Sequence, residues 1–263
     1  MRLMEADWTL PQPGWGALAV WRRNLRVWRK LIGPAVVLNF GEPTLYLLGL
    51  GFGLGAFIDT MSGMPYLAFL ASGIIASSAM TTASFEGTYS VFTRMDVQRT
   101  YDAMLATPLT LDDILAGEML WCATKAGFSA AAILAVAALL GVTGGWEALW
   151  ALPVAFLIGL CFGGLALVVS AVSSNYDFFN YYFVLAVTPM LILCGVFYPI
   201  EGLPPAMQAA IQVLPLTHAV ALARPLVAGL PVTDVALHVA VLVLYAGAGF
   251  YLALALARRR LLV

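Results

Sequence analysis

The chain has 263 residues, of which 62% are hydrophobic and only 10% are charged. A soluble domain carries roughly 25% charged residues, so a chain this apolar lacks the polar surface to cover itself in water. The net charge of -1 excludes a nucleic-acid partner held by a basic surface. The only lysines, Lys30 and Lys125, stand in no phosphate-binding loop, so ATP hydrolysis by that route is not expected. Three cysteines and two histidines are scattered singly, which predicts neither disulfides nor a metal site.

Residues 15–33 are predicted to form an amphipathic helix in the membrane interface, because apolar residues recur at spacings of three and four and basic residues occupy the remaining surface. An apolar stripe with tryptophans beside a basic face is typical of interfacial helices. The residues assigned to this surface are Trp21, Arg22, Arg26, Trp28 and Arg29. The alternative is a surface helix packed on a soluble domain. Residues 1–13 contain no apolar run, so no cleavable signal peptide is expected.

Six apolar runs predict an all-α integral membrane fold with six transmembrane helices, because a span needs about 20 mostly apolar residues. The spans are expected at 35–58, 65–90, 114–140, 147–172, 178–198 and 233–257. With both termini in the cytoplasm, eleven of the thirteen lysines and arginines lie on the cytoplasmic side, as the positive-inside rule requires. A five- or seven-span model would separate the basic residues of 15–33 from the arginines at the C-terminal end.

Residues 199–232 are predicted to form short re-entrant helices on the extracytoplasmic side. This segment contains six of the fourteen prolines and is nevertheless rich in aliphatic residues. Each piece between prolines is too short to cross a bilayer. The alternative is an ordinary extracytoplasmic loop.

Two local patterns predict details of the third and fourth spans. Thr110 and Asp113 have the spacing of a capping box, which marks the start of a helix. Gly159 and Gly163 form a pair of small residues four positions apart, which lets the fourth span approach another helix closely.

Four ionisable residues lie within the apolar runs and are predicted to form an intramembrane charge network. They are Glu42, Glu86, Glu118 and Lys125. A charge in the bilayer is costly, so each should face protein or water rather than lipid. We expect Lys125 to pair with Glu42 or Glu86 in the inner half of the membrane, near the mouth of a pathway. The alternative is an ion pair that only holds helices together.

Aromatic residues gather at the two ends of the fifth span, and the favoured interpretation is a pair of interfacial belts. The alternative is that some of them stack on sugar rings in a lumen.

The connection between the second and third spans is predicted to hold a short amphipathic helix over residues 92–107. Its charged residues are expected to project into the cytosol, and its apolar residues to face a partner or the membrane. The charged set is Arg94, Asp96, Arg99 and Asp102. The alternative is a plain solvated connector. A membrane protein without an energy source of its own needs an ion gradient or an ATPase partner. This connection is the only cytoplasmic segment expected to be large enough to dock such a partner.

The whole chain resembles the permease subunit of ABC-2 type exporters. Residues 195–205 and 214–220 are similar to the signature region of that family. More narrowly, residues 21–24, 46–55, 94–99 and 117–125 resemble the permeases that export nodulation lipo-chitooligosaccharides.

The resemblance implies one ABC-2 transmembrane domain over residues 1–263, with the type V exporter fold: an elbow helix over 15–33, a coupling helix over 92–107 and re-entrant helices before the last span. It further implies a permease homodimer in the bacterial inner membrane, joined to separate ATPase subunits that hold ATP and Mg, and the export of a glycolipid or lipo-oligosaccharide. This chain would then need no cofactor and no catalytic residue of its own. ATP-driven closure of the partner would push on residues 92–107.

Two other functions remain as alternatives from the sequence. An ion-gradient-driven secondary transporter would use Glu42, Glu86 and Lys125 as its relay, but no inverted repeat is visible. A membrane-embedded enzyme would need clustered carboxylates or histidines at the membrane face, and none converge in the sequence.

Overall fold

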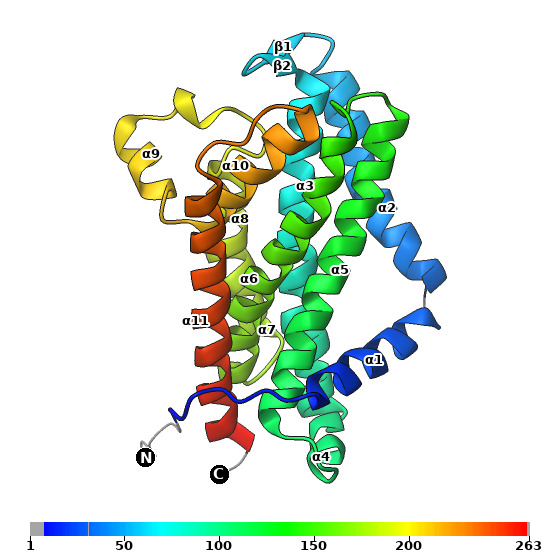
Figure 1. The fold of residues 1–263 in the computed structure, drawn as a ribbon, viewed down its shortest axis with the longest axis vertical. Helices are drawn as coiled ribbons and strands as arrows, with labels where there is room; N and C mark the ends of the chain where they lie inside the picture. Colours follow the sequence, from blue (N-terminus) through cyan, green and yellow to red (C-terminus); the bar gives the residue numbers. More distant parts are fainter. Residues whose placement is uncertain (1–7, 31, 262–263) are drawn as a thin grey trace.

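The protein is a bundle of long helices, shown by a computed structural model that describes residues 8–30 and 32–261 and, within them, no side chains at residues 34–40, 42 and 43. The described chain begins and ends at the bottom of Figure 1, at the same end of the bundle as α4. This arrangement is the one expected when a chain crosses a bilayer an even number of times. In chain order the elements are α1 (Gly16–Arg29), α2 (Ile32–Gly53), β1 (Thr60–Met61), β2 (Met64–Pro65), α3 (Tyr66–Phe85), η1 (Glu86–Ser90), η2 (Thr93–Val97), α4 (Thr100–Leu105), α5 (Leu111–Leu139), η3 (Trp146–Trp150), α6 (Ala151–Val172), α7 (Asp177–Tyr182), η4 (Phe183–Val187), α8 (Thr188–Leu193), η5 (Ile200–Gly202), α9 (Pro205–Ile211), α10 (Pro215–Ala228) and α11 (Val235–Leu261).

Four helical stretches among the described residues are long and apolar enough to cross a membrane. They are Tyr66–Val97, Leu111–Leu139, Trp146–Val172 and Val235–Leu261. They correspond to the predicted second, third, fourth and sixth spans. The first and fifth predicted spans coincide with shorter apolar helices, Thr44–Gly53 and Asp177–Leu193. The all-α membrane architecture is therefore confirmed, and the count of six spans stays a prediction.

The second predicted span is longer than expected, because α3 continues through two π-helical segments, η1 and η2, as far as Val97. A π-helical turn inserts one extra residue per turn and re-aims the side chains that follow it, and such turns occur often at functional sites. Glu86 opens η1 and Arg94 lies in η2. Asp96 also lies in η2, so all three charged residues of this span lie in its π-helical part.

The centre of the bundle is α6, which packs closely against α5 and α11. A Cβ at Gly159 would lie 2.5 Å from the Cα of Ala123, and a Cβ at Gly163 would lie 2.8 Å from the Cβ of Cys122. Only glycine permits backbones this close, so the packing predicted from this glycine pair is confirmed.

The start of α5 is fixed by the predicted capping box. The Thr110 hydroxyl accepts from the backbone N–H of Asp113 at 3.2 Å, and the Asp113 carboxylate accepts from the backbone N–H of Thr110 at 3.2 Å. Two of the unpaired N–H groups near the helix start are satisfied in this way, which anchors the first turn of the helix.

The opposite end carries a tight hairpin and a bent helix pair. Ser62 and Gly63 join β1 to β2 with φ values of 50° and 78°, the left-handed conformation that two-residue hairpin turns require. Helices α9 and α10 meet at 92°. The prolines thus break the predicted segment into short helices, and their entry into the membrane stays a prediction.

Candidate functional site

A buried network of charged side chains joins η1, η2 and α5 toward the lower end of the bundle in Figure 1. Its carboxylates are Glu86 and Glu118, which are 5% and 0% exposed. Its cations are Arg94 and Lys125, whose side chains are 14% and 22% exposed. Two negative and two positive groups balance, so the network is electrically neutral as a unit. Only such pairing allows four ionisable groups to leave water together.

Arg94 is the centre of this network. Its Nε donates to Glu118 Oε1 at 2.9 Å and its Nη2 donates to Glu118 Oε2 at 2.6 Å. The same Nη2 also donates to Glu86 Oε1 at 3.0 Å. The two-pronged contact with Glu118 is the geometry in which a guanidinium binds a carboxylate most strongly. Arg94 therefore ties the end of the second span to α5.

Lys125 closes the network from deeper in the bundle. Its Nζ donates to Glu86 Oε2 at 3.0 Å, while Trp121 Nε1 donates to Glu86 Oε1 at 3.1 Å. Of the two partners predicted for Lys125, Glu86 is confirmed as a contact. The side chain of Glu42 lies outside the described part of the structure.

Asn24 brings the interfacial helix α1 into the same network. It is 3% exposed, and its Nδ2 donates to Glu118 Oε2 at 2.9 Å. Arg23 donates from Nη1 to Asn24 Oδ1 at 2.9 Å. Burial, and after it the nearby Arg94 guanidinium, lower the pKa of Arg23. Asn24 was not predicted from the sequence, although a lone neutral polar residue among apolar and basic ones is a signal that could have identified it.

The connection between the second and third predicted spans differs from the predicted single helix over 92–107. The second span runs on to Val97, the backbone turns at Arg99 with a φ of 48°, and α4 follows. The prediction that Arg94 projects into the cytosol is wrong, because the π-helical segment turns its side chain into the bundle. The other three charged residues lie on the exposed tip as predicted: Asp96, Arg99 and Asp102.

The apolar side of α4 is packed on the protein. Tyr101 is 0% exposed and Met104 is also buried, in a cluster with residues of η2 and α5. The Tyr101 hydroxyl is buried and makes no hydrogen bond among the described residues. The apolar residues expected to face a partner or the membrane are Val97, Tyr101 and Met104; Tyr101 and Met104 anchor the tip instead, and of the three only Val97 is exposed.

Both ends of the described chain are tied to this region. Arg258 near the end of α11 donates from Nη2 to both carboxylate oxygens of Asp112, at 2.9 and 2.8 Å. The backbone N–H of Gln12 donates to Asp112 Oδ2 at 2.8 Å. Arg260 donates to Asp96 Oδ1 at 2.9 Å. These contacts link residues far apart in sequence, and the pairing of Arg258 with Asp112 was not predicted from the sequence.

Helix α1 lies against α5 with its basic side outward. Trp21 Nε1 donates to Thr124 Oγ1 at 2.9 Å, and the Trp28 ring stacks on Phe128 with centroids 4.9 Å apart. The basic residues assigned to the interface are all exposed: Arg22, Arg26 and Arg29. The predicted apolar and basic faces are thus both present, and the tryptophans contact the bundle.

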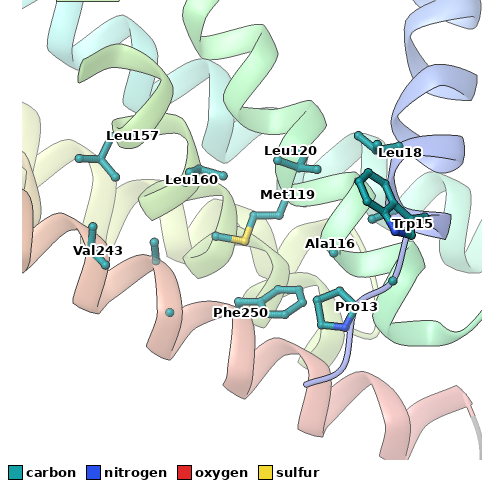
Figure 2. Close-up of a pocket in the computed structure, with 14 residues that line it drawn as sticks. Pro13, Trp15, Leu18, Ala116, Met119, Leu120, Leu157, Leu160, Val243 and Phe250 are labelled. Carbon is teal, nitrogen blue, oxygen red and sulfur yellow. The ribbon is translucent and has the colours of Figure 1, made fainter. Parts of the chain in front are cut away.

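An apolar groove opens beside α1, between α5, α6 and α11 (Figure 2). Its volume is about 660 Å³, and none of the described side chains that line it is charged. Figure 2 shows Trp15 and Pro13 at one end, Met119 facing Phe250 in the middle, and Val243 at the other end. Val243 and Phe250 are seven residues apart, so the groove follows α11 for about 10 Å.

Aromatic side chains gather where α7 and η4 pack on the second span. Tyr89 stacks on Phe85 with ring centroids 4.5 Å apart, and Tyr176 lies parallel to Tyr89 at 6.0 Å. Phe179 and Phe183 also contact the Tyr89 ring. Three of the aromatic residues that open the fifth predicted span, Tyr176, Phe179 and Phe183, thus pack on the second span, whereas Phe178 and Tyr181 are exposed, and the interfacial belts stay a prediction.

Comparison with known proteins points to one family over most of the chain. A family model described as "ABC-2 type transporter" matches residues 17–228. The chain is 44% identical to "Nodulation protein J" of Rhizobium meliloti (strain 1021), over 96% of this chain and 97% of that protein. It is 47% identical to the protein of the same name from Rhizobium leguminosarum bv. trifolii, over 98% and 100% of the two chains. It is also 24% identical to "Inner membrane transport permease YadH" of Escherichia coli (strain K12), over 78% and 80%.

Proposed function

We propose that this chain, which belongs to the ABC-2 type transporter family, is the permease subunit of an ATP-driven exporter of a glycolipid, lipo-oligosaccharide or related amphiphile. Membership in this family implies partnership with an ABC ATPase subunit. In our proposal two copies of the permease join two ATPase subunits, which hold ATP and Mg. The complex lies in the bacterial inner membrane, with both ends of the permease in the cytoplasm.

The apolar groove supports the choice of an amphiphilic substrate. It reaches from the interfacial helix α1 into the bundle on the cytoplasmic half, where an acyl chain of the inner leaflet could enter sideways. Trp15 stands at the groove end that lies on α1 and is 87% exposed, as suits a residue at the membrane interface. Arg22 lies one helical turn from Leu18 of the groove and is exposed, so it is available to the polar head of the same molecule.

The cytoplasmic tip supports the way in which the ATPase would drive the permease. Asp96, Arg99 and Asp102 offer an exposed charged surface, while Tyr101 fixes α4 to the interior. A push on this tip therefore reaches the ends of the second span and α5 directly. The charge network holds those ends together with α1, so the three elements would move as one unit.

Coupling can be tested in the complex of permease and ATPase. In our proposal, replacing Arg99 and Asp102 together by alanine lowers substrate-stimulated ATP hydrolysis and export at least several-fold. Asp59→Ala is the matched control, because Asp59 is equally exposed at the opposite end of the bundle. Full coupling in the double variant would remove this tip from the ATPase contact.

The substrate class can be tested separately by filling the groove. Gly247 lines the groove, and a Cβ added there meets no atom within 4 Å, so Gly247→Leu projects into open space. We expect this variant to fold. Its complex with the ATPase should lose most of the increase in ATP hydrolysis that glycolipids cause. Gly127→Leu is the control, because Gly127 has the same free space but does not line the groove. If glycolipids stimulate ATP hydrolysis equally in both variants, the groove is not the entry site.

The ion-driven alternative has no support from the family match. An export assay in vesicles with ATP, in which the proton and sodium gradients are collapsed, separates the two mechanisms. Our proposal requires that export continues under those conditions and stops when ATP is withheld.

A further inference from the structure

A polar cavity lies at the end of the bundle opposite α4, and the proposed export path does not use it. It is formed by the β1–β2 turn, η5, α10 and the start of α11, and its volume is about 350 Å³. Besides Ser62 of the turn, its polar side chains are Glu201, Gln212, Thr217, Arg224, Thr233 and His238. A small cavity with several converging polar groups is the usual form of a ligand site.

Arg224 supplies a positive charge that no carboxylate among the described residues neutralises by contact. Its Nη2 donates to the carbonyl of Gly195 at 2.6 Å and its Nε donates to Ser72 Oγ at 3.3 Å. Its guanidinium lies 3.6 Å from the centre of the Phe69 ring. All three partners are neutral, and within the described chain Nη1 makes no hydrogen bond. A guanidinium fork taken out of water on neutral partners is suited to a phosphate or carboxylate.

A pair of histidines provides a second donor that depends on pH. His218 Nε2 lies 2.8 Å from the carbonyl of Gln212, which can only accept, so Nε2 carries the proton. The Nδ1 of a neutral His218 must then accept, and His238 Nδ1, 2.8 Å away, donates to it. His238 can therefore take a second proton on Nε2 without breaking this bond, whereas protonation of His218 would place two donors face to face.

The charged groups around His238 are one cation and two carboxylates, so a ligand that carries a positive group beside its phosphate matches them best. Arg224 and Glu201 share its cavity, Asp234 lies on the turn before α11, and His218 contacts it from α10. Glu201 forms no ion pair with Arg224 in the described structure, so its carboxylate is free for a positive group of the same ligand. A phosphoethanolamine headgroup carries both charges at a short separation.

We propose that this outer cavity binds a phosphate group through Arg224 and the protonated form of His238. The phosphate could belong to a lipid headgroup of the outer leaflet or to free phosphate, because both offer the same oxygens to the guanidinium. Binding would join η5, α10 and α11, and so would stabilise the bent helix pair against the last span.

The test measures equilibrium binding of inorganic phosphate and of glycerophosphoethanolamine to the purified permease–ATPase complex in a phosphate-free detergent buffer. We expect Arg224→Gln to weaken binding of both probes roughly tenfold or more, as loss of a charged hydrogen bond does. Arg259→Gln is the control, since Arg259 is exposed at the other end of α11. Equal binding by wild type and Arg224→Gln would overturn the proposal.

Two further arms separate the source of the phosphate and guard against misfolding. If the ligand is a headgroup, glycerophosphoethanolamine binds more tightly than inorganic phosphate, and Glu201→Gln removes the difference; if it is free phosphate, the two probes bind alike. Binding of glycerophosphoethanolamine, whose phosphodiester keeps a single charge, should strengthen as the pH is lowered, because protonated His238 adds a positive charge, and His238→Gln should abolish this change. Arg224→Lys keeps the charge and should retain part of the affinity. Binding that ignores pH in the wild type would remove His238 from the site.

Discussion

Removal of Arg94 should destabilise the protein more than removal of any exposed arginine. In Arg94→Met, Glu118 keeps only the amide of Asn24, while Glu86 keeps Lys125 and Trp121. Glu118 is fully buried, so its charge is left without a cation in a medium that solvates it poorly. Breaking a buried ion pair on one side costs about 3–5 kcal/mol, or roughly two to three and a half orders of magnitude in the folding equilibrium.

The assay is the free energy of unfolding of the purified permease in mixed micelles, measured by titration with a denaturing detergent. Arg22→Met is the control, because Arg22 is exposed on α1 and its loss should change stability by less than about 0.5 kcal/mol. The double variant Arg94→Met with Glu118→Gln removes both charges of the bidentate pair and should recover part of the loss. If Arg94→Met costs no more than the control, or if the double variant shows no coupling, the network does not hold these elements together.

Three further predictions concern packing. Gly117→Ala should lower the free energy of unfolding by about 1–3 kcal/mol, because the new Cβ would lie 2.6 Å from the carbonyl oxygen of Ala17. Gly127→Ala is the control: its Cβ meets open space, so this substitution should be neutral or stabilising. Gly249→Ala should cost a similar amount, since its Cβ would lie 2.8 Å from the Gly164 carbonyl carbon, and Gly247→Ala on the same helix should not. The three cysteines are all buried, so a maleimide should label none of them in the folded protein and all of them after unfolding; rapid labelling of the folded protein would contradict the packing.

The sequence predicts the helices well because their causes are local. The run of apolar residues in each long span, the capping box at Thr110 and the glycine pair at 159 and 163 each depend on neighbours within a few positions. The pairing of Lys125 with Glu86 was accessible for a related reason, because few charges lie in the membrane and each needs a partner. The choice between Glu42 and Glu86 as the partner could not be predicted from the sequence, since it depends on how three helices are placed relative to one another.

The position of Arg94 shows what local patterns leave out. From the sequence, Arg94 lies beyond the end of the span and resembles its neighbours Asp96 and Arg99, which are exposed. Two π-helical segments extend the helix and rotate the side chains that follow them, and no residue pattern in 86–97 predicts these segments. The rotation is favourable because it places the Arg94 guanidinium against the carboxylates of Glu86 and Glu118. Glu118 is in reach only because α5 packs beside the second span.

The same rotation makes the cytoplasmic tip rigid with respect to the helices that it joins. If Arg94 pointed outward, the tip would be a solvated loop that a partner could move without moving the helices. With Arg94 held between Glu86 and Glu118, and Tyr101 buried beneath α4, the tip is continuous with the second span, α5 and α1. A charge that the sequence places on the docking surface therefore joins the tip to the helices in the structure; in the proposed mechanism this would let a push on the tip reach them.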